Sequence, residues 1–409
     1  MQQKYTFPII INYINLISAL SLILGFMFSD FSFDRIVLIV FFATYIIEIF
    51  TDKKIQNFKF DKKAIYFLVM LFFFLLAFIY TLFENSTEYT QLLIEKRLSL
   101  FVFSIVGLLG FNHLFKLKYF LYAFVFTSLI TIIYVVLRVN ISDFIMLPNR
   151  AELFTAMRVE YVNGHMIFDF YLNIALLSGW VLLKMNWNKM SFWYHVFMIA
   201  ILIFILTILS LTEGRSGFTA GVLLFISLIS YEVIRRQKAI GYVFLLIVPL
   251  ISVYIIKSHN RMSVNELKGE PRIFLWQSGL NVFSNNPVFG LGISDAQVAF
   301  DVERVKNQGD EFKIYTSNFK HVDCHNQYIQ TLMEFGIFGL IILLFLYTFP
   351  AFIADRSNQI FSIFALTLCA YQSVFDMFAT GSFSFIFAFL MVLMLRSKGE
   401  ISVLESQES

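Results

Sequence analysis

Continuous apolar runs of membrane-spanning length recur along almost the whole chain. A helix that crosses a bilayer needs about 20 mostly apolar residues, and its backbone polar groups must be bonded internally. The runs lack the polar alternation typical of transmembrane β-barrel strands. The sequence therefore predicts an all-α integral membrane protein. About twelve transmembrane helices are expected, near 8–28, 36–50, 64–83, 98–112, 119–138, 166–184, 194–212, 217–234, 239–256, 332–354, 360–378 and 382–396.

The composition supports this class and argues against others. Of the 409 residues, 58% are hydrophobic and 14% are charged, whereas soluble domains contain about 25% charged residues. The formal net charge of +3 is too small to indicate nucleic-acid binding. Two cysteines, Cys324 and Cys369, are too few for a disulfide framework.

Lysine and arginine in the short loops predict the orientation, because cytoplasmic loops are enriched in both. The segment 51–63 holds five lysines, and later basic loops fall on the same side. Both termini are therefore expected in the cytoplasm, with the first apolar run retained as a helix. We divide the chain into nine helices (1–256), one long outer loop with an interfacial helix (257–331), and three helices with a cytoplasmic tail (332–409).

Three polar segments stand out on the predicted outer face, where 140–165 is expected to form a smaller cap. In "LTEGRSGF" (211–218), Arg215 interrupts an apolar stretch. A charge so close to the membrane is costly and is usually paired or functional; a tight Glu213–Arg215 turn with side chains reaching the surface is the simpler alternative. The second segment, 270–292, predicts an amphipathic helix carrying Arg272, then a turn at "NNPVFGLG".

The third polar segment, "HVDCHNQYIQTLMEFGIFGL" (321–340), precedes an apolar run. His325 and Gly336 are eleven residues apart, about three helical turns, so a continuous helix would place them on one face. Gly336 and Gly339 would allow close packing against another helix. His325 is a natural proton acceptor at neutral pH, although a histidine that caps the helix beside Asp323 is an alternative.

A metal site is a further alternative for this segment. Its candidate ligands are His321, Asp323, Cys324 and His325, but their spacing matches no familiar zinc pattern. We therefore expect neither a metal nor a cofactor.

Together these segments resemble the O-antigen ligase and O-antigen polymerase family of bacterial membrane glycosyltransferases. The family motif is a histidine followed by Asn, Ser or Gln, nine residues, and Gly-x-x-Gly, which here reads His325-Asn326 to Gly336-Ile337-Phe338-Gly339. "PRIFLWQSGLNVFSNNPVFGLG" resembles the family's arginine–tryptophan segment, and "EGRSGF" its outer arginine motif. Thr219 stands where ligases of the family often have leucine.

The resemblance implies a glycosyltransferase-C-like enzyme of the bacterial inner membrane. Its donor would be a glycan on undecaprenyl diphosphate, and its acceptor a glycan or lipid A–core hydroxyl. Arg215 and Arg272 would bind the diphosphate, because arginine grips phosphate oxygens with two donors. His325 would act as the base in a single inverting displacement. Asn326, Arg97 and His165 are weaker substrate-binding candidates; Arg97 alternatively only marks a helix end.

A secondary transporter or glycan flippase is the alternative from another class. It would require charged residues at the midplane of several spans. The candidates are Glu48, Asp169 and Asp376, which the predicted boundaries place near helix ends. The long loop after the ninth span also argues against a transporter built from two similar halves.

Overall fold

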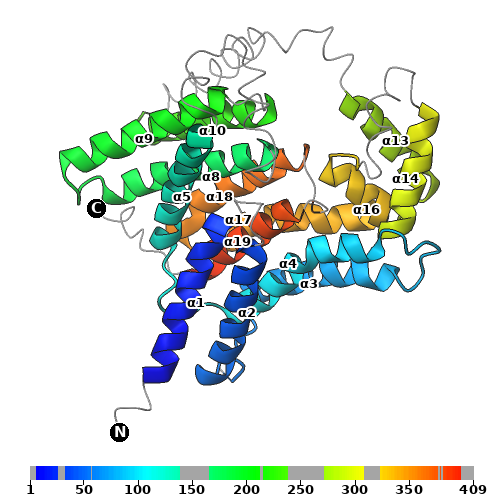
Figure 1. Cartoon of the computed structure of the whole chain (residues 1–409), viewed down its shortest axis with the longest axis horizontal. Helices are drawn as coiled ribbons and strands as arrows, with labels where there is room; N and C mark the ends of the chain where they lie inside the picture. Colours follow the sequence, from blue (N-terminus) through cyan, green and yellow to red (C-terminus); the bar gives the residue numbers. More distant parts are fainter. Residues whose placement is uncertain are drawn as a thin grey trace.

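The fold is described from a computed structural model of the chain (Figure 1). The structure describes residues 6–25, 33–56, 58–138, 165–211, 215–237, 271–307, 323–375, 378 and 381–397. These residues form helices joined by turns. The helices are α1 (Thr6–Gly25), α2 (Phe33–Thr51), α3 (Lys62–Tyr80), α4 (Thr90–Leu109), α5 (Leu117–Arg138), α8 (His165–Asn186), α9 (Phe192–Leu211), α10 (Arg215–Arg236), α13 (Pro271–Asn285), α14 (Ile293–Asn307), α16 (Gln327–Thr348), α17 (Pro350–Ile353), α18 (Arg356–Gln372) and α19 (Ser382–Arg396).

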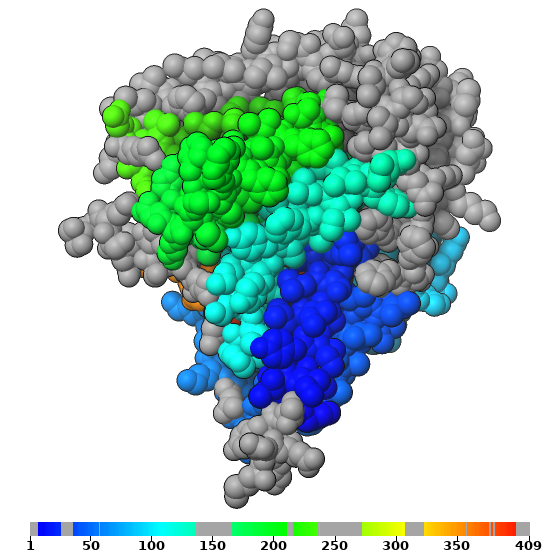
Figure 2. Space-filling model, turned by 60° about the vertical axis from the view of Figure 1, so that its left-hand side comes forward, coloured from blue at the N-terminus to red at the C-terminus, as the bar shows by residue number. Residues whose placement is uncertain are grey.

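The described helices agree with an all-α, multi-pass membrane protein. Seven of them are long and apolar enough to cross a membrane: α1, α3, α5, α8, α9, α10 and α16. Large apolar side chains on the outside of the bundle are exposed, as lipid-facing residues must be; examples are Ile17, Ile133 and Trp193. Figure 2 shows the face that α1, α5, α9 and α10 form.

Eleven of the twelve predicted apolar runs fall on described helices. The ninth run, 239–256, and most of the predicted cap, 140–164, lie outside the described residues. Two helix starts differ from the prediction: α4 begins at Thr90, not near 98, and α16 begins at Gln327, not near 332. In both cases the additional turns contain buried polar residues, such as Arg97 in α4 and Gln330 in α16, which lie outside the apolar runs.

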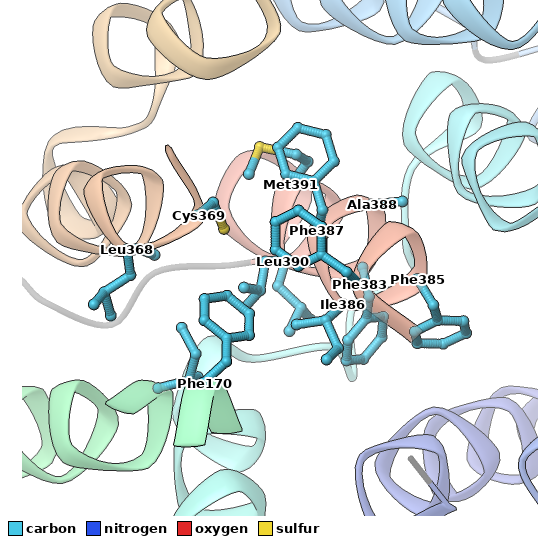
Figure 3. Packing of buried hydrophobic residues seen from close by; sticks show 14 of the residues in the cluster. Phe170, Leu368, Cys369, Phe383, Phe385, Ile386, Phe387, Ala388, Leu390 and Met391 are labelled. Atoms are coloured by element: carbon cyan, nitrogen blue, oxygen red, sulfur yellow. The ribbon is translucent and has the colours of Figure 1, made fainter. Parts of the chain in front are cut away.

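The bundle is assembled around α19. From Phe383 to Leu395 every residue of this helix is buried, so it is apolar on all sides, as expected of a helix enclosed by others. Figure 3 shows Phe170 of α8 and Cys369 of α18 beside it. Aromatic rings fill the contacts: the ring centroids of Phe103 and Phe385 are 4.9 Å apart, and those of Phe170 and Phe383 are 5.6 Å apart.

Helices α13 and α14 lie together at one end of the molecule (Figure 1). The sequence predicted only the first of them. The second, α14, buries a stripe formed by Ile293, Ala296 and Phe300, a spacing typical of an amphipathic helix. The loop between α3 and α4 holds its start, because Glu84 Oε1 accepts the Ser294 N–H at 2.7 Å. We call this the α13–α14 end.

Candidate functional site

Gly336 interrupts α16 in the middle of the polar motif. Its backbone angles, φ 61° and ψ −159°, are not helical, so the prediction of one continuous helical face from His325 to Gly336 is wrong. The break leaves backbone N–H and C=O groups of α16 without helical partners, and these groups form hydrogen bonds with the turn 286–292. Ile337 N–H donates to Pro287 O at 2.9 Å, and Gly292 N–H donates to Glu334 O at 2.9 Å.

This pairing, which we call the clasp, requires glycine on both of its sides. A Cβ at Gly336 would lie 2.3 Å from Val288 O, and one at Gly290 would lie 2.5 Å from Glu334 O. Gly336 therefore packs against a turn and not against another helix. A Cβ at Gly339 would meet the Cβ of Phe335 on the same helix at 2.3 Å; that Gly339 allows close packing against another helix stays a prediction. The clasp ties the end of α13 to the start of α16.

His325 lies just before α16, in a left-handed conformation with φ 49°. Asp323 holds it twice: Oδ1 accepts the His325 backbone N–H at 3.1 Å and lies 3.2 Å from Nδ1. A carboxylate at Nδ1 favours the tautomer with a free Nε2 lone pair. The side chain of His325 is 40% exposed, so part of the imidazole can meet a ligand from outside.

Asn326 caps α16. Its side-chain oxygen accepts the N–H groups of Tyr328 and Ile329 at 3.0 and 3.1 Å, and its side chain is nearly buried. The structure thus assigns Asn326, and not the predicted histidine, to the capping of this helix. The cap fixes the residue that follows His325 directly.

Cys324 faces the interior of the protein. Its Sγ lies 3.2 Å from Asn326 O and 3.4 Å from Gln330 Oε1. Burial, and secondarily the charge of Asp323, raises the pKa of the Cys324 thiol well above its usual value. The described residues contain no group of three or more His, Cys, Asp or Glu side chains placed to hold a metal ion; His321, one of the predicted ligands, lies outside them.

Arg272 sits in the first turn of α13 and points towards α8 and α18. Its Nη2 is 3.5 Å from Met166 Sδ, and its guanidinium carbon is 5.4 Å from the ring centroid of Phe375. Nearby, the hydroxyl of Tyr371 is hydrogen-bonded to Thr219 of α10. The threonine that departs from the family pattern therefore links α10 to α18 next to Arg272.

His165 and Arg215 are the first residues of α8 and α10. Their side chains lie outside the described part of the structure, but the two helix starts are adjacent. Asn173 Nδ2 donates to Gly217 O at 3.0 Å. A Cβ at Gly217 would come within 2.1 Å of the Asp169 Cβ, so glycine is needed for this close approach.

The end of α18 joins these pieces into one site. Gln327 N–H at the start of α16 donates to Ser373 O at 2.8 Å, and Gln372 Nε2 lies 3.4 Å from Met166 O in α8. The N-termini of α8, α10, α13 and α16 therefore meet around the end of α18. Helix N-termini carry partial positive charge; at α16 the first N–H groups are already bonded to Ser373 O and to the Asn326 side chain, so this helix contributes only its dipole. With Arg272, the dipoles of these helices favour an anionic group at this point of the structure.

Arg97 does not join this cluster. Its Nη2 bonds both carboxylate oxygens of Glu334, at 2.6 and 2.8 Å, and both side chains are at most 3% exposed. Glu334 is a residue that the sequence analysis missed, although a lone acid before an apolar run is a recognisable signal. Tyr371 and Phe375 were also missed, and nothing in their local sequence marks them.

Residues 199–344 match the family model described as O-antigen ligase. The match runs from α9 into α16 and includes Arg215, Arg272 and His325, whereas His165 and Arg97 precede it. The match supports the family resemblance of the motifs, which lie within it. No curated protein matches the chain.

Proposed function

We propose that this chain, as a relative of the O-antigen ligases, is a membrane glycosyltransferase. It transfers a glycan from undecaprenyl diphosphate to an acceptor hydroxyl on the outer face of the inner membrane. The observation that carries this proposal is the meeting of four helix N-termini beside His325, with Arg272 in the same cluster. The family match supports the coarser statement, a glycosyltransferase of the ligase or polymerase type.

Arg215 and Arg272 act on the leaving group. The bond that breaks joins the anomeric carbon to a diphosphate oxygen, and the departing diphosphate gains negative charge. Arginine donates through a planar fork and keeps its proton in proteins. The helix N-termini add backbone dipoles of the same sign. Stabilisation of this kind is strongest when its donors are already in place before the reaction.

His325 acts on the acceptor. Nε2 takes the proton of the acceptor hydroxyl while that oxygen forms its bond to the anomeric carbon. Asp323 holds Nδ1 and stabilises the imidazolium that results. Attack from the face opposite the diphosphate inverts the anomeric configuration, and the imidazolium then returns its proton to water. Because the energy for the new bond is stored in the donor, no nucleotide is consumed.

The orientation in the membrane follows from charge. Ion pairs at the ends of the helices far from His325 include Lys63–Asp355 and Lys184–Glu232. Cytoplasmic loops are the basic ones. We therefore assign the α13–α14 end to the outer side and both termini to the cytoplasm.

The transporter alternative finds little support in the position of its charges. Glu48 accepts a hydrogen bond from Asn112 at 3.0 Å and pairs with Lys54, at the end of α2 beside the basic segment 51–63. Asp169 is buried against the start of α10. Glu48 and Asp169 thus belong to different ends of the bundle; Asp376, the third candidate, lies outside the described residues.

The test is transfer by purified protein in proteoliposomes given undecaprenyl-diphosphate-linked glycan and an acceptor. Formation of a new glycosidic bond, lost in His325→Ala, supports the proposal. Movement of intact donor across the bilayer without bond formation would show a flippase. The acceptor then separates the family members: growth of the glycan chain indicates a polymerase, and glycan on lipid A–core indicates a ligase.

A further inference from the structure

A buried ion pair joins Arg97 of α4 to Glu334 of α16. The residues are 237 positions apart in the sequence. Ions so deeply buried lose most of their hydration, so such a pair persists only with good geometry and further hydrogen bonds. Gln330 Nε2 supplies one of these bonds, to Glu334 Oε1 at 2.7 Å.

The hydrogen bonds continue from the pair towards His325. Gln330 Oε1 lies 3.4 Å from the Sγ of Cys324, and that Sγ lies 3.2 Å from Asn326 O. All the side chains in this series, from Arg97 to Cys324, are buried. The series ends at Cys324 and Asn326, the two residues that flank His325.

The backbone conformation of His325 is unfavourable, so the contacts around it must hold it in place. A non-glycine residue with positive φ is strained, and His325 has φ 49°. Conformations of this kind persist only where the surrounding contacts determine them. Glu334 also takes part in the clasp, because its backbone carbonyl oxygen accepts the Gly292 N–H at 2.9 Å. The pair therefore secures the first turns of α16 from the clasp up to the histidine.

We infer that Arg97 and Glu334 are a positioning pair for His325, acting through Gln330 and Cys324. The inference rests on the proposed role of His325 as the base. It gives Arg97 a different task from the donor binding that the sequence suggested. It also gives Cys324 a task, as the buried neutral thiol that connects α16 to the loop before it.

The most direct variant is Gln330→Leu, which interrupts the series without leaving an ion alone. Glu334→Gln and Arg97→Lys follow as variants of the pair itself. We expect kcat to fall by about 10-fold to 10²-fold, since small misplacements of a reacting group have effects of this size. The KM for the lipid-linked donor should stay within about twofold of wild type. A KM that rises tenfold or more at unchanged kcat would show that Arg97 binds donor, and would overturn the inference.

The reactivity of Cys324 gives a second readout that needs no substrate. In a Cys369→Ala background it is the only thiol, because the chain has two cysteines. Burial raises its pKa, so N-ethylmaleimide should label it slowly at pH 7.5. We expect Gln330→Leu and Glu334→Gln to increase the labelling rate about tenfold or more as the loop loosens. Unchanged labelling together with unchanged kcat would refute the coupling.

Ser99→Ala is the matched control. Ser99 lies two residues after Arg97 on α4, is buried, and bonds Ser384 Oγ at 2.8 Å. Its loss should change neither kcat nor labelling. If Ser99→Ala had the same effects as Gln330→Leu, general loosening of α4 and α16 would explain both, and the inference would be wrong. If the wild-type protein shows no transfer, the proposed function fails, and labelling alone decides whether the pair controls the loop.

Discussion

Oδ1 of Asp323 lies 3.2 Å from Nδ1 of His325 and 3.1 Å from the backbone nitrogen of the same residue. One carboxylate therefore sets both the backbone position and the tautomer of the imidazole. Because the other ring nitrogen is left as the acceptor, the geometry suits a base that faces outwards.

For Asp323→Asn we expect a loss of about 10- to 100-fold in kcat, the range typical of residues that orient an imidazole. The amide keeps an oxygen that can accept the backbone bond but does not stabilise the imidazolium. Transfer should be measured at matched protein levels. A kcat within about twofold of wild type would limit Asp323 to a loop contact.

For His325→Ala we expect a loss of roughly 10²- to 10⁴-fold, the contribution of a positioned base. The fold should persist, since Asn326 caps α16 and the imidazole is partly exposed. His195→Ala, at the start of α9, is the control and should be fully active. If His325→Ala retained activity within about threefold, the base would have to be sought elsewhere.

Arg215→Lys and Arg272→Lys should each reduce kcat/KM by about 10²-fold, as the loss of a charge-stabilising donor does. Lysine keeps the charge but does not form the two-pronged contact with a diphosphate. The exposed Arg356 lies at the start of α18, and Arg356→Lys should behave as wild type. Near-normal transfer by either site variant would show that the residue serves packing or long-range attraction.

Transfer should continue after treatment with chelator. Two arginines and several helix N-termini can neutralise the leaving diphosphate, the task that a divalent ion performs in other enzymes. Protein stripped with EDTA is assayed with and without added Zn²⁺ or Mg²⁺. Activity that requires the metal, and that disappears in the Cys324→Ala and His321→Ala double variant, would identify a metal site.

Gly336→Ala should destabilise the protein by roughly 1–3 kcal/mol or more, because it combines a strained φ with loss of the clasp. Gly110→Ala separates the two effects. Gly110 also has positive φ, 75°, but an added Cβ would meet nothing closer than 4.0 Å. Thermal unfolding in detergent should show the larger loss for Gly336→Ala, and equal losses would mean that the clasp contributes little.

The sequence predicted the features that depend on local patterns. Apolar runs locate the helices, and residue type and motif spacing identify Arg272 and His325 as candidate site residues. The surroundings depend on contacts between distant segments. Arg97 lies near the start of an apolar run, and its partner Glu334 is far along the chain, so no window of sequence shows the pair.

The error at Gly336 has a similar cause. Helical spacing assumes an unbroken helix, and the break exists because the turn 286–292 supplies hydrogen bonds to the residues around it. Thr219 departs from the family pattern, but its contact is with Tyr371, which lies on another helix. Both features require the tertiary structure.

The enclosure of α19 has a consequence for biosynthesis. Among the described helices, those that it touches precede it in the chain, including α4, α8, α17 and α18. Proteins are made from the N-terminus, so these partners enter the membrane before the helix that fills the space between them has been synthesised. Until then their inner faces must be covered by lipid or by an insertion factor. The final packing is thus a post-insertion event, and premature termination before Ser382 would leave a bundle without its centre, a substrate for membrane proteases.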